Sequence, residues 1–416
     1  MKLLFVVPHP IDPPDRGNKH HTLNILRRLA IQHDIDVIAF DEDSERSAAS
    51  WERVTKANPR VRLVLRVAKN RGLRLVLEQI KSLLRLRPAV LGRYRSHEVF
   101  QLLESSLGRY DVVCFDMFMT AEGRAHCLEI PGLLLVTDAY SMMVHRSRML
   151  PVTAIRKLRL IAEEWLLRNY ERSAYPTFER LLVVSRVDIA WLAESAPGAR
   201  CEFLPIPVEA AVAGAPAVEH AATVQPTVCC WSQVSNDSVA LGVRDFLEGA
   251  WPEIRVQVVG ARCVIWGKSP HPLLQRARSL PGVTFVEFVD DWLAYLRRMT
   301  VLVYPQRCGS GLQTKVQSAM ALGLPCVLTP ETVGGLPAID GTTCLVRDST
   351  QGLIEACTKL LVDASLRKRI GEAARVAVME QHEAQRIADQ FIGAAVAAMC
   401  DHRAMTQGGL NTAERA

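Results

Sequence analysis

The chain has 416 residues, 49% of them apolar, and a formal net charge of +6. This length exceeds what one ordinary hydrophobic core holds, so we expect two domains of about 200 residues each. No apolar run is long enough to span a bilayer, and the first ten residues, MKLLFVVPHP, are interpreted as a buried strand and not as a signal peptide. The eleven cysteines are scattered without a Cys-x-x-Cys pair, which disfavours a zinc site and favours reduced thiols in a cytoplasmic protein.

The first half of the chain alternates short apolar runs with amphipathic stretches. The runs that predict strands are Leu3–Val7, Ile35–Phe40, Val112–Phe115, Leu133–Thr137 and Arg180–Ser185. Helical patterns between them include Thr22–Ala30 and Ala154–Tyr170. This order predicts a parallel sheet with helices on both faces, in an N-terminal domain that covers residues 1–204.

A polar loop with one glycine follows the first predicted strand. Arg16 and Gly17 lie in this loop, directly before an amphipathic helix. Loops after parallel strands are where such sheets bind ligands, so both residues are candidates for contact with a substrate. The alternative is a surface loop that only starts the helix.

Residues 60–95 are strongly basic, because eleven Lys and Arg accompany a single acid, Glu78, for a net charge of +10. Apolar residues recur at helical spacing in this stretch, at Leu73, Val76, Leu77, Ile80, Leu83 and Leu84. The pattern fits a helix on an anionic membrane surface, and hence a peripheral protein on the inner face of the membrane. The alternative, given equal weight, is a solvated helix that covers the core. A nucleic-acid partner is disfavoured, since no aromatic residues are interleaved with the charges.

Two aspartates follow predicted strands of the first half. Asp138 ends the segment that starts at Leu133, and Asp116 directly follows Phe115. At the carboxyl end of a strand, either carboxylate is a candidate polar contact or base for a substrate. An aspartate that caps the next helix is at least as common. His9 and His145 are further candidates, although a single histidine is more often structural.

The segment 205–226 is rich in Ala, Pro and Val and has no regular period, which predicts a linker. Strands are then predicted at Val228–Trp231, Arg255–Val259, Val283–Phe288, Val301–Tyr304 and Cys326–Leu328. They imply a second doubly wound domain over residues 227–385, a helix over 386–400 that can return to the first domain, and a disordered tail over 401–416. Two such domains facing each other bind ligands in the cleft at the carboxyl ends of their strands.

A second polar loop follows the strand predicted at Val228–Trp231. Ser232, Ser235 and Asn236 lie in this loop, before a helix that begins near Val239. These residues are candidates for ligand contact at the cleft. The alternative is an N-cap, in which Asn236 or Asp237 satisfies free helix amides, and the two interpretations are compatible.

The most informative motif is CGSGLQTKVQSAMALGLPCVLTP, which begins at Cys308. Gly309 and Gly311 allow the backbone to approach a ligand closely, and the helix that follows directs its unpaired amides at the loop. A phosphate is the expected occupant. Lys315 near the helix start is unfavourable toward the helix dipole, which a bound diphosphate or a nearby acid would offset.

The second half resembles the C-terminal domain of retaining glycosyltransferases of the group 1 type, which have the GT-B fold. The segments that carry this resemblance are the strand and loop from Val228 to Asn236, PGVTFVEFVDDWLAYL, and the glycine motif. The resemblance covers roughly residues 1–400 and is strongest over 228–346. It implies a nucleoside diphosphate sugar bound mainly by the C-terminal domain and an acceptor bound mainly by the N-terminal domain.

The chain departs from this family at two positions. Members commonly have a glutamate before the Ala-Met-Ala of the helix, for the donor ribose, and many have another eight residues earlier. Alignment on Lys315 places Ser318 and Ser310 at these positions. Gln317 is adjacent to Ser318 but points about 100° away around the helix.

The resulting hypothesis is a retaining glycosyltransferase that moves a sugar from a nucleoside diphosphate to a hydroxyl acceptor, which is a glycan, a lipid-linked molecule or a small molecule. The resemblance implies that Lys315 and Asp138 are catalytic, and that the leaving phosphate itself helps to deprotonate the acceptor. The residues implied to bind the donor are Ser232, Asn236, Gly309, Ser310, Gly311, Leu312 and Ser318. No cofactor and no metal are expected. The alternatives are a non-catalytic binding subunit with this fold and, ranked last, a nucleotide-sugar epimerase.

Overall fold

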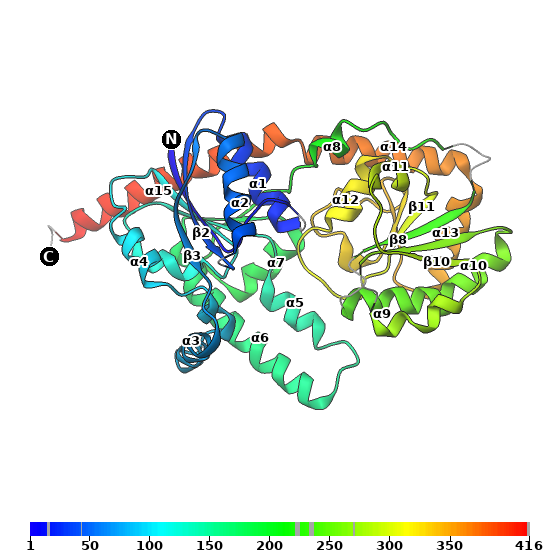
Figure 1. The fold of residues 1–416 in the computed structure, drawn as a ribbon, viewed down its shortest axis with the longest axis horizontal. Helices are drawn as coiled ribbons and strands as arrows, with labels where there is room; N and C mark the ends of the chain where they lie inside the picture. Colours follow the sequence, from blue (N-terminus) through cyan, green and yellow to red (C-terminus); the bar gives the residue numbers. More distant parts are fainter. Residues whose placement is uncertain (15–16, 43, 221–224, 233–236, 269–270, 414–416) are drawn as a thin grey trace. The chain divides into compact units, whose positions relative to one another are not determined.

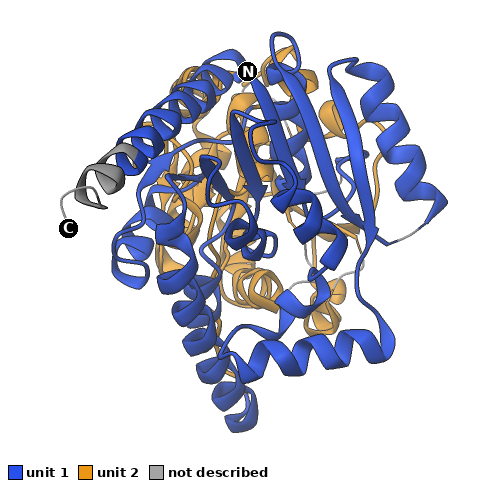
Figure 2. Cartoon of the chain, turned by 90° about the vertical axis from the view of Figure 1, so that its left-hand side faces the viewer, with its two compact units in different colours: residues 1–145, 153–207, 384–416 blue, residues 146–152, 208–383 orange. Residues whose placement is uncertain are grey.

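A computed structural model describes residues 1–14, 17–42, 44–220, 225–232, 237–268 and 271–413. The chain forms two compact units (Figure 2). Unit 1 comprises residues 1–145, 153–207 and 384–416, and unit 2 comprises residues 146–152 and 208–383. In the part of the chain that is described, no helix has the length and apolar character needed to cross a membrane.

Unit 1 contains a seven-stranded sheet in the order β3-β2-β1-β4-β5-β6-β7, in which every pairing is parallel. Its strands are β1 (Lys2–Val7), β2 (Asp34–Asp41), β3 (Val61–Ala68), β4 (Val112–Asp116), β5 (Gly132–Val136), β6 (Arg180–Val183) and β7 (Cys201–Phe203). Its helices are α1 (Gly17–Leu29), α2 (Glu45–Ala57), α3 (Gly72–Leu84), α4 (His97–Glu104), α5 (Tyr140–Ser147), α6 (Ala154–Ala174), α7 (Arg186–Ser195) and α15 (Ala384–Ala413) (Figure 1).

Helices cover both faces of this sheet, because its central strands are apolar on both sides. Leu4 and Val6 of β1 belong to one core, and Leu3 and Phe5 point to the other. The second core is closed in part by α15, whose Phe391 stacks on Phe5 with ring centroids 5.8 Å apart.

Unit 2 repeats the architecture with a six-stranded parallel sheet in the order β10-β9-β8-β11-β12-β13. Its strands are β8 (Thr227–Trp231), β9 (Arg262–Trp266), β10 (Val283–Val286), β11 (Val301–Tyr304), β12 (Cys326–Leu328) and β13 (Leu345–Val346). Its helices are α8 (Ala210–Ala213), α9 (Asp237–Asp245), α10 (Trp251–Gln257), α11 (Trp292–Leu296), α12 (Thr314–Ala321), α13 (Thr350–Val362) and α14 (Ala364–Gln381). The prediction of two doubly wound α/β domains is confirmed.

One predicted strand of the second half is wrong. Residues 255–259 were assigned to a strand, but 255–257 end helix α10, and the strand of this region is β9, which begins at Arg262. Burial differs among the apolar residues of this region. Ile254 and Val258 face the core, whereas Val256 and Val259 are 76% and 92% exposed. That spacing is helical, and a short window does not separate it from a strand.

Two edge strands of unit 1, β3 and β7, were not predicted from the sequence. β3 contributes alternating residues to the sheet and buries few of them, so its basic side chains mask it in a search for apolar runs. Residues 402–413, predicted to be part of a disordered tail, continue helix α15. Asp401 forms ion pairs with Arg180 and Arg200, and His402 Nδ1 lies 2.8 Å from Glu179 Oε1, so the start of this segment is held by polar contacts that the composition does not reveal.

Candidate functional site

The glycine loop of unit 2 runs from the carboxyl end of β11 to the start of α12. A Cβ atom on Gly309 would lie 2.2 Å from Nε2 of Gln306, so no larger residue fits without moving that side chain. Gly311 has a φ of +69°, a conformation that favours glycine. The loop therefore needs glycine at both positions for its own backbone path, whereas the close approach of a ligand stays a prediction.

Several hydrogen bonds fix this loop. The amide of the Gln306 side chain donates to the carbonyl of Cys308, and Thr329 Oγ1 donates to the Gln306 carbonyl at 2.7 Å. Arg146, from the short segment 146–152 of unit 2, donates to the carbonyl of Gly309. Arg146 was not predicted, because it is distant in sequence and carries no motif.

Lys315 lies in the first turn of α12 and is half-buried. Burial lowers the pKa of its ammonium group to about 8. Its Nζ atom lies 5.6 Å from the ring centroid of Trp231, a cation–π contact. Among the residues that the structure describes, no carboxylate forms an ion pair with Lys315, so the nearby acid that would offset its charge at this helix start is not found there.

Aromatic rings line the adjoining part of the same sheet edge. Trp231 ends β8 and Trp266 ends β9, and the two are register partners that stack with centroids 4.8 Å apart. Trp292 lies 5.2 Å from Trp231, and Tyr295 packs edge-on against Trp266 at 5.3 Å. This cluster was not predicted, although a tryptophan at the end of each of two apolar runs could have indicated it.

Ser232 follows Trp231 directly and is 1% exposed. Its amide donates to the carbonyl of Trp266 at 3.0 Å, whereas its hydroxyl has no hydrogen-bond partner in the described structure. An unpaired buried hydroxyl costs free energy, so a partner at this position would stabilise the site. Asn236, the second residue predicted in this loop, lies outside the described residues.

The two serines that replace the usual glutamates flank the helix start. Ser310 is buried in the glycine loop, with Leu312 two residues on, and Ser318 is half-buried on α12. Gln317 is also buried, and its Nε2 atom lies 2.9 Å from Nδ1 of His382. Gln317 therefore faces the end of α14 and does not substitute for the missing carboxylate at Ser318.

The carboxyl edge of the unit 1 sheet is of a different kind. Asp116 ends β4, is fully buried, and accepts a hydrogen bond from Thr22 Oγ1 at 2.8 Å. Burial raises the pKa of this carboxyl to about 7, and its Oδ1 atom has no hydrogen-bond partner in the described structure. Asn18 of α1 lies nearby, with its Nδ2 atom 3.3 Å from His9 Nε2 and 3.2 Å from the sulfur of Met117.

The remaining predicted residues of unit 1 lie around this edge. Gly17 is the first residue of α1, and Arg16 lies outside the described residues. Asp138 is half-buried between the end of β5 and the start of α5. The backbone amide of Ala139, near the start of α5, donates to Asp188 Oδ2 at 2.8 Å. Asp188, and not Asp138, therefore accepts the hydrogen bond of this amide. Nδ1 of His145 lies 3.0 Å from Oε1 of Glu164. Asp138 and Lys315 belong to different units.

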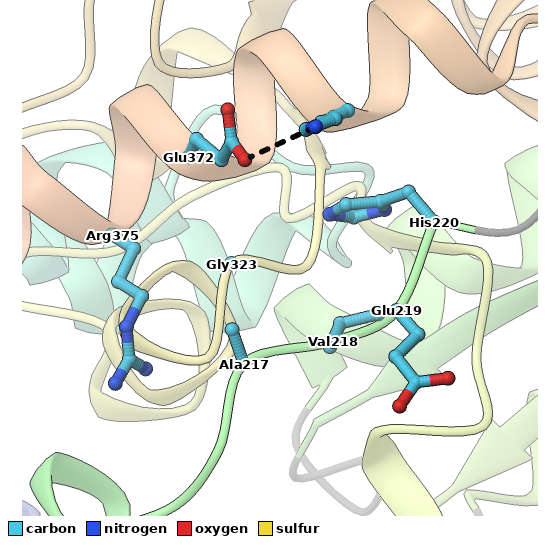
Figure 3. Close-up of a pocket in the computed structure, with 8 residues that line it drawn as sticks. Ala217, Val218, Glu219, His220, Gly323, Glu372 and Arg375 are labelled. Atoms are coloured by element: carbon cyan, nitrogen blue, oxygen red, sulfur yellow. Dashed lines mark ion pairs between the residues drawn. The ribbon is translucent and has the colours of Figure 1, made fainter.

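A cavity of about 350 Å³ lies elsewhere in unit 2 (Figure 3). It is bordered by Gly323, which follows the carboxyl end of α12, whereas Lys315 lies at the amino end of that helix. Among its lining residues, Lys368 pairs with Glu372 at 3.9 Å, and Arg375 donates to the carbonyls of Ala321 and Ala215. This cavity is therefore separate from the predicted phosphate loop.

Comparison with known proteins shows a family likeness in the second half of the chain. Residues 225–363 match the family described as glycosyl transferases group 1. The chain carries a group 1 glycosyltransferase domain. Over 169 residues it is also 31% identical to N-acetyl-alpha-D-glucosaminyl L-malate synthase of Bacillus anthracis, a match that spans 38% of this chain and 42% of that protein.

Solved structures extend the likeness beyond the glycosyltransferase domain to both units. Sucrose-phosphate synthase of Thermosynechococcus elongatus aligns with a TM-score of 0.67 at 15% identity, covering 94% of this chain and 97% of that one. HepE of Anabaena in complex with UDP aligns with a TM-score of 0.64 at 12% identity, covering 94% and 99%. At these identities the likeness establishes the fold, which is GT-B.

Proposed function

We propose that the protein transfers a sugar from a nucleoside diphosphate to a hydroxyl acceptor with retention of the anomeric configuration. The observation that carries the proposal is Lys315, a half-buried cation at a helix start that no described carboxylate offsets. It adjoins a loop that needs glycine at Gly309 and Gly311. A diphosphate is the ligand that supplies the missing negative charge at such a position.

The aromatic cluster supports a nucleotide as the carrier of that diphosphate. Trp231 contacts Lys315 through its ring and also packs against Trp266 and Trp292. The half-buried rings of Trp231 and Trp292 next to the glycine loop suit a base, because bases stack on aromatic rings with about 1–3 kcal/mol each. UDP and UDP-glucose are bound by HepE, a protein of the same fold, which makes uracil the first base to try.

In the proposed reaction, the bond between the sugar carbon and the diphosphate oxygen breaks, and a bond to the acceptor oxygen forms on the same face of the sugar. Lys315 and the amides of the loop from Gly309 to Gly311 stabilise the charge that develops on the leaving diphosphate. The acceptor proton passes to a phosphate oxygen of the leaving group. Leu312 and Ser318 lie beside this group, and Ser318 offers a hydroxyl to the ribose.

On the acceptor side, we propose that unit 1 binds the hydroxyl compound at the carboxyl edge of its sheet. Asp138 would orient the acceptor, and Arg16 and Gly17 would contact the diphosphate. Asp116 is an additional candidate, since its free Oδ1 atom is buried and its raised pKa lets it accept or donate a hydrogen bond near neutral pH. A lipid-linked hydroxyl compound is one of the acceptor classes.

Calorimetric titration with UDP, GDP, ADP and CDP tests the donor site. We expect one nucleotide to bind at micromolar to sub-millimolar strength, and Lys315→Ala to weaken it by about 10- to 100-fold, since a hydrogen bond to a charged group is worth about 1.5–3 kcal/mol. The matched control is Lys359→Ala, which removes an exposed lysine from α13 of the same unit and should bind like wild type. Equal weakening by both variants would contradict the assignment of Lys315.

A second candidate function is a non-catalytic binding subunit. It is favoured by Ser310 and Ser318, which supply no charge where related proteins commonly have glutamates. Incubation of the bound nucleotide sugar with a panel of acceptors separates the two functions. Acceptor-dependent release of nucleoside diphosphate supports the transferase, and tight donor binding without release by any acceptor supports the binding subunit.

A further inference from the structure

Helix α3 lies on unit 1 with its apolar face turned outward. The residues 45% or more exposed are Leu73, Val76, Leu77, Ile80, Leu83 and Leu84, and Leu73 and Leu84 reach 84% and 79%. Only Ser82 is fully buried on this helix. A solvated helix that covers a core would show the reverse pattern.

Polar contacts hold the inner face of α3. Arg95, outside the helix, pairs with Glu78 at 3.2 Å, whereas Lys81 and Ser82 contact Glu78 within α3, at 2.6 Å and 2.9 Å. Gly92 lies so close beneath that a Cβ atom there would be 2.6 Å from the carbonyl carbon of Glu78. The outward direction of the leucines is therefore fixed by the packing of the opposite face.

Helix α6 adds a second exposed apolar surface to the same unit. Its first turns expose Ile155, Leu158, Ile161 and Trp165, with Ile155 83% and Leu158 69% exposed. Figures 1 and 2 show α3 and α6 projecting on the same side of unit 1. Arg87, just after α3, lies over the ring of Tyr170, near the carboxyl end of α6, at 5.8 Å.

The basic charge of residues 60–95 is mostly neutralised within unit 1. The cations that contact carboxylates are Arg62, Arg66, Lys69, Arg71, Lys81, Arg87, Arg93 and Arg95. Arg74 and Arg85 are exposed on and just after α3, and no described carboxylate pairs with them. Lys157 and Arg159 are likewise exposed among the apolar residues of α6.

We propose that the outward faces of α3 and α6 form a docking surface for a membrane that contains anionic lipids. Large exposed apolar side chains interleaved with unpaired cations suit a bilayer interface, where leucines enter the acyl region and arginines meet the phosphates. A second protein copy fits less well, because the cores of protein interfaces are depleted of charge. The inference is independent of sugar transfer, since its readout is vesicle binding alone.

Sedimentation with vesicles of phosphatidylcholine, with and without phosphatidylglycerol, tests this surface. We expect wild type to sediment with both at low salt and to prefer the anionic vesicles by at least severalfold. Leu77→Glu on α3 and Leu158→Glu on α6 should each reduce the bound fraction by several fold. The matched control is Val259→Glu, which makes the same kind of change at a 92% exposed residue of unit 2 and should bind like wild type.

The charged part of the surface has its own variant. The double change Arg74→Ala and Arg85→Ala should abolish most of the preference for anionic vesicles while binding to neutral vesicles persists. Thermal unfolding of each variant, with a midpoint equal to that of wild type, shows that folding is intact. Absence of wild-type binding to anionic vesicles, or equal loss with Val259→Glu, would overturn the proposal. A wild-type dimer that Leu77→Glu converts to monomer, without vesicle binding, would assign the surface to a second copy instead.

Discussion

At the carboxyl edge of the unit 2 sheet lie a cluster of aromatic rings and a lysine that no described carboxylate pairs with, whereas the same edge of unit 1 holds a buried carboxyl and the threonine that donates to it. Lys315 and Trp231 represent the first kind, and Asp116 and Thr22 the second. Both edges belong to parallel sheets with helices on both faces. The architecture therefore sets where ligands bind, and the side chains after each strand set which ligands they are.

Under the proposed function, this contrast corresponds to two kinds of substrate. A cation next to stacked rings suits an anionic nucleotide. A buried carboxyl whose pKa is near 7 suits an uncharged hydroxyl compound, with which it can exchange hydrogen bonds in either protonation state.

The largest effect is expected at Asp116. Its pKa in the folded state, about 7, is above the ordinary value of 3.8, so ionisation opposes folding. The fold gains stability as the pH falls from 7 towards 4, and this contribution is lost as the pH rises through 7. Asp116→Asn removes the titration, so relative to wild type the variant should be more stable at pH 8 than at pH 4, by on the order of 4 kcal/mol.

Urea unfolding at pH 8 and at pH 4 measures this difference. The matched control is Asp348→Asn, which changes an exposed aspartate of unit 2 and should show no such pH-dependent difference from wild type. If Asp116→Asn behaves like the control, the buried carboxyl does not titrate near neutrality, and its role near an acceptor loses support.

An effect of opposite sign is expected at His21, one residue before Thr22 on α1. Its ring is fully buried, both ring nitrogens are without a hydrogen-bond partner in the described structure, and burial lowers its pKa to about 4. The stability it contributes is present above pH 6.5 and is lost as the pH falls towards 4. His21→Leu should therefore gain about 3 kcal/mol relative to wild type between pH 7 and pH 4.

The same unfolding experiments serve for this variant, with His97→Leu, at an exposed histidine of unit 1, as the control. A constant difference between His21→Leu and wild type across this pH range would mean that water reaches the ring. The environment of α1 would then be less apolar than the contrast between the two sheet edges requires.

The close approach of the backbone in unit 2 gives the third prediction. A Cβ atom on Gly242 of α9 would lie 1.6 Å from the carbonyl oxygen of Pro305, which follows β11. Gly242→Ala should destabilise the protein by about 1–3 kcal/mol and weaken nucleotide binding, because the segment leading to the glycine loop must shift. The control is Gly393→Ala on α15, where nothing lies within 4 Å and a gain of about 0.5–1 kcal/mol is expected. Equal melting temperatures for the two variants would contradict this packing.

The smallest effect concerns the pH dependence of nucleotide binding. Lys315 carries its charge below pH 8 and loses it above, because burial lowers its pKa to about 8. A bound diphosphate raises that pKa again, so affinity should be constant up to pH 7.5 and then fall by about tenfold per pH unit. Calorimetry from pH 6.5 to 9.5 measures this fall. Lys315→Arg should remove the pH dependence, and a fall that persists in this variant would assign it to another group.

The fold class could be predicted from the sequence alone, as could a glycine loop before a helix. Apolar runs alternating with helical patterns predict parallel sheets, because only a buried strand is apolar on both faces. Gly309, Gly311 and Lys315 were found because a glycine loop before a helix is a local signal, read from residues that are neighbours in the chain. Strand β9 was misplaced for the same reason, since a short window around Val258 does not separate a helix end from a strand.

The other features of the two sheet edges could not be predicted from the sequence, because they depend on tertiary packing. The stacking of Trp231 on Trp266 depends on the register of β8 with β9, and Arg146 reaches the glycine loop from a segment more than 150 residues away in sequence. The raised pKa of Asp116 and the lowered pKa of Lys315 follow from burial, which no local pattern specifies. The outward direction of the leucines of α3 also could not be predicted from the sequence. A helical period shows that a helix has an apolar face, but not which way that face turns.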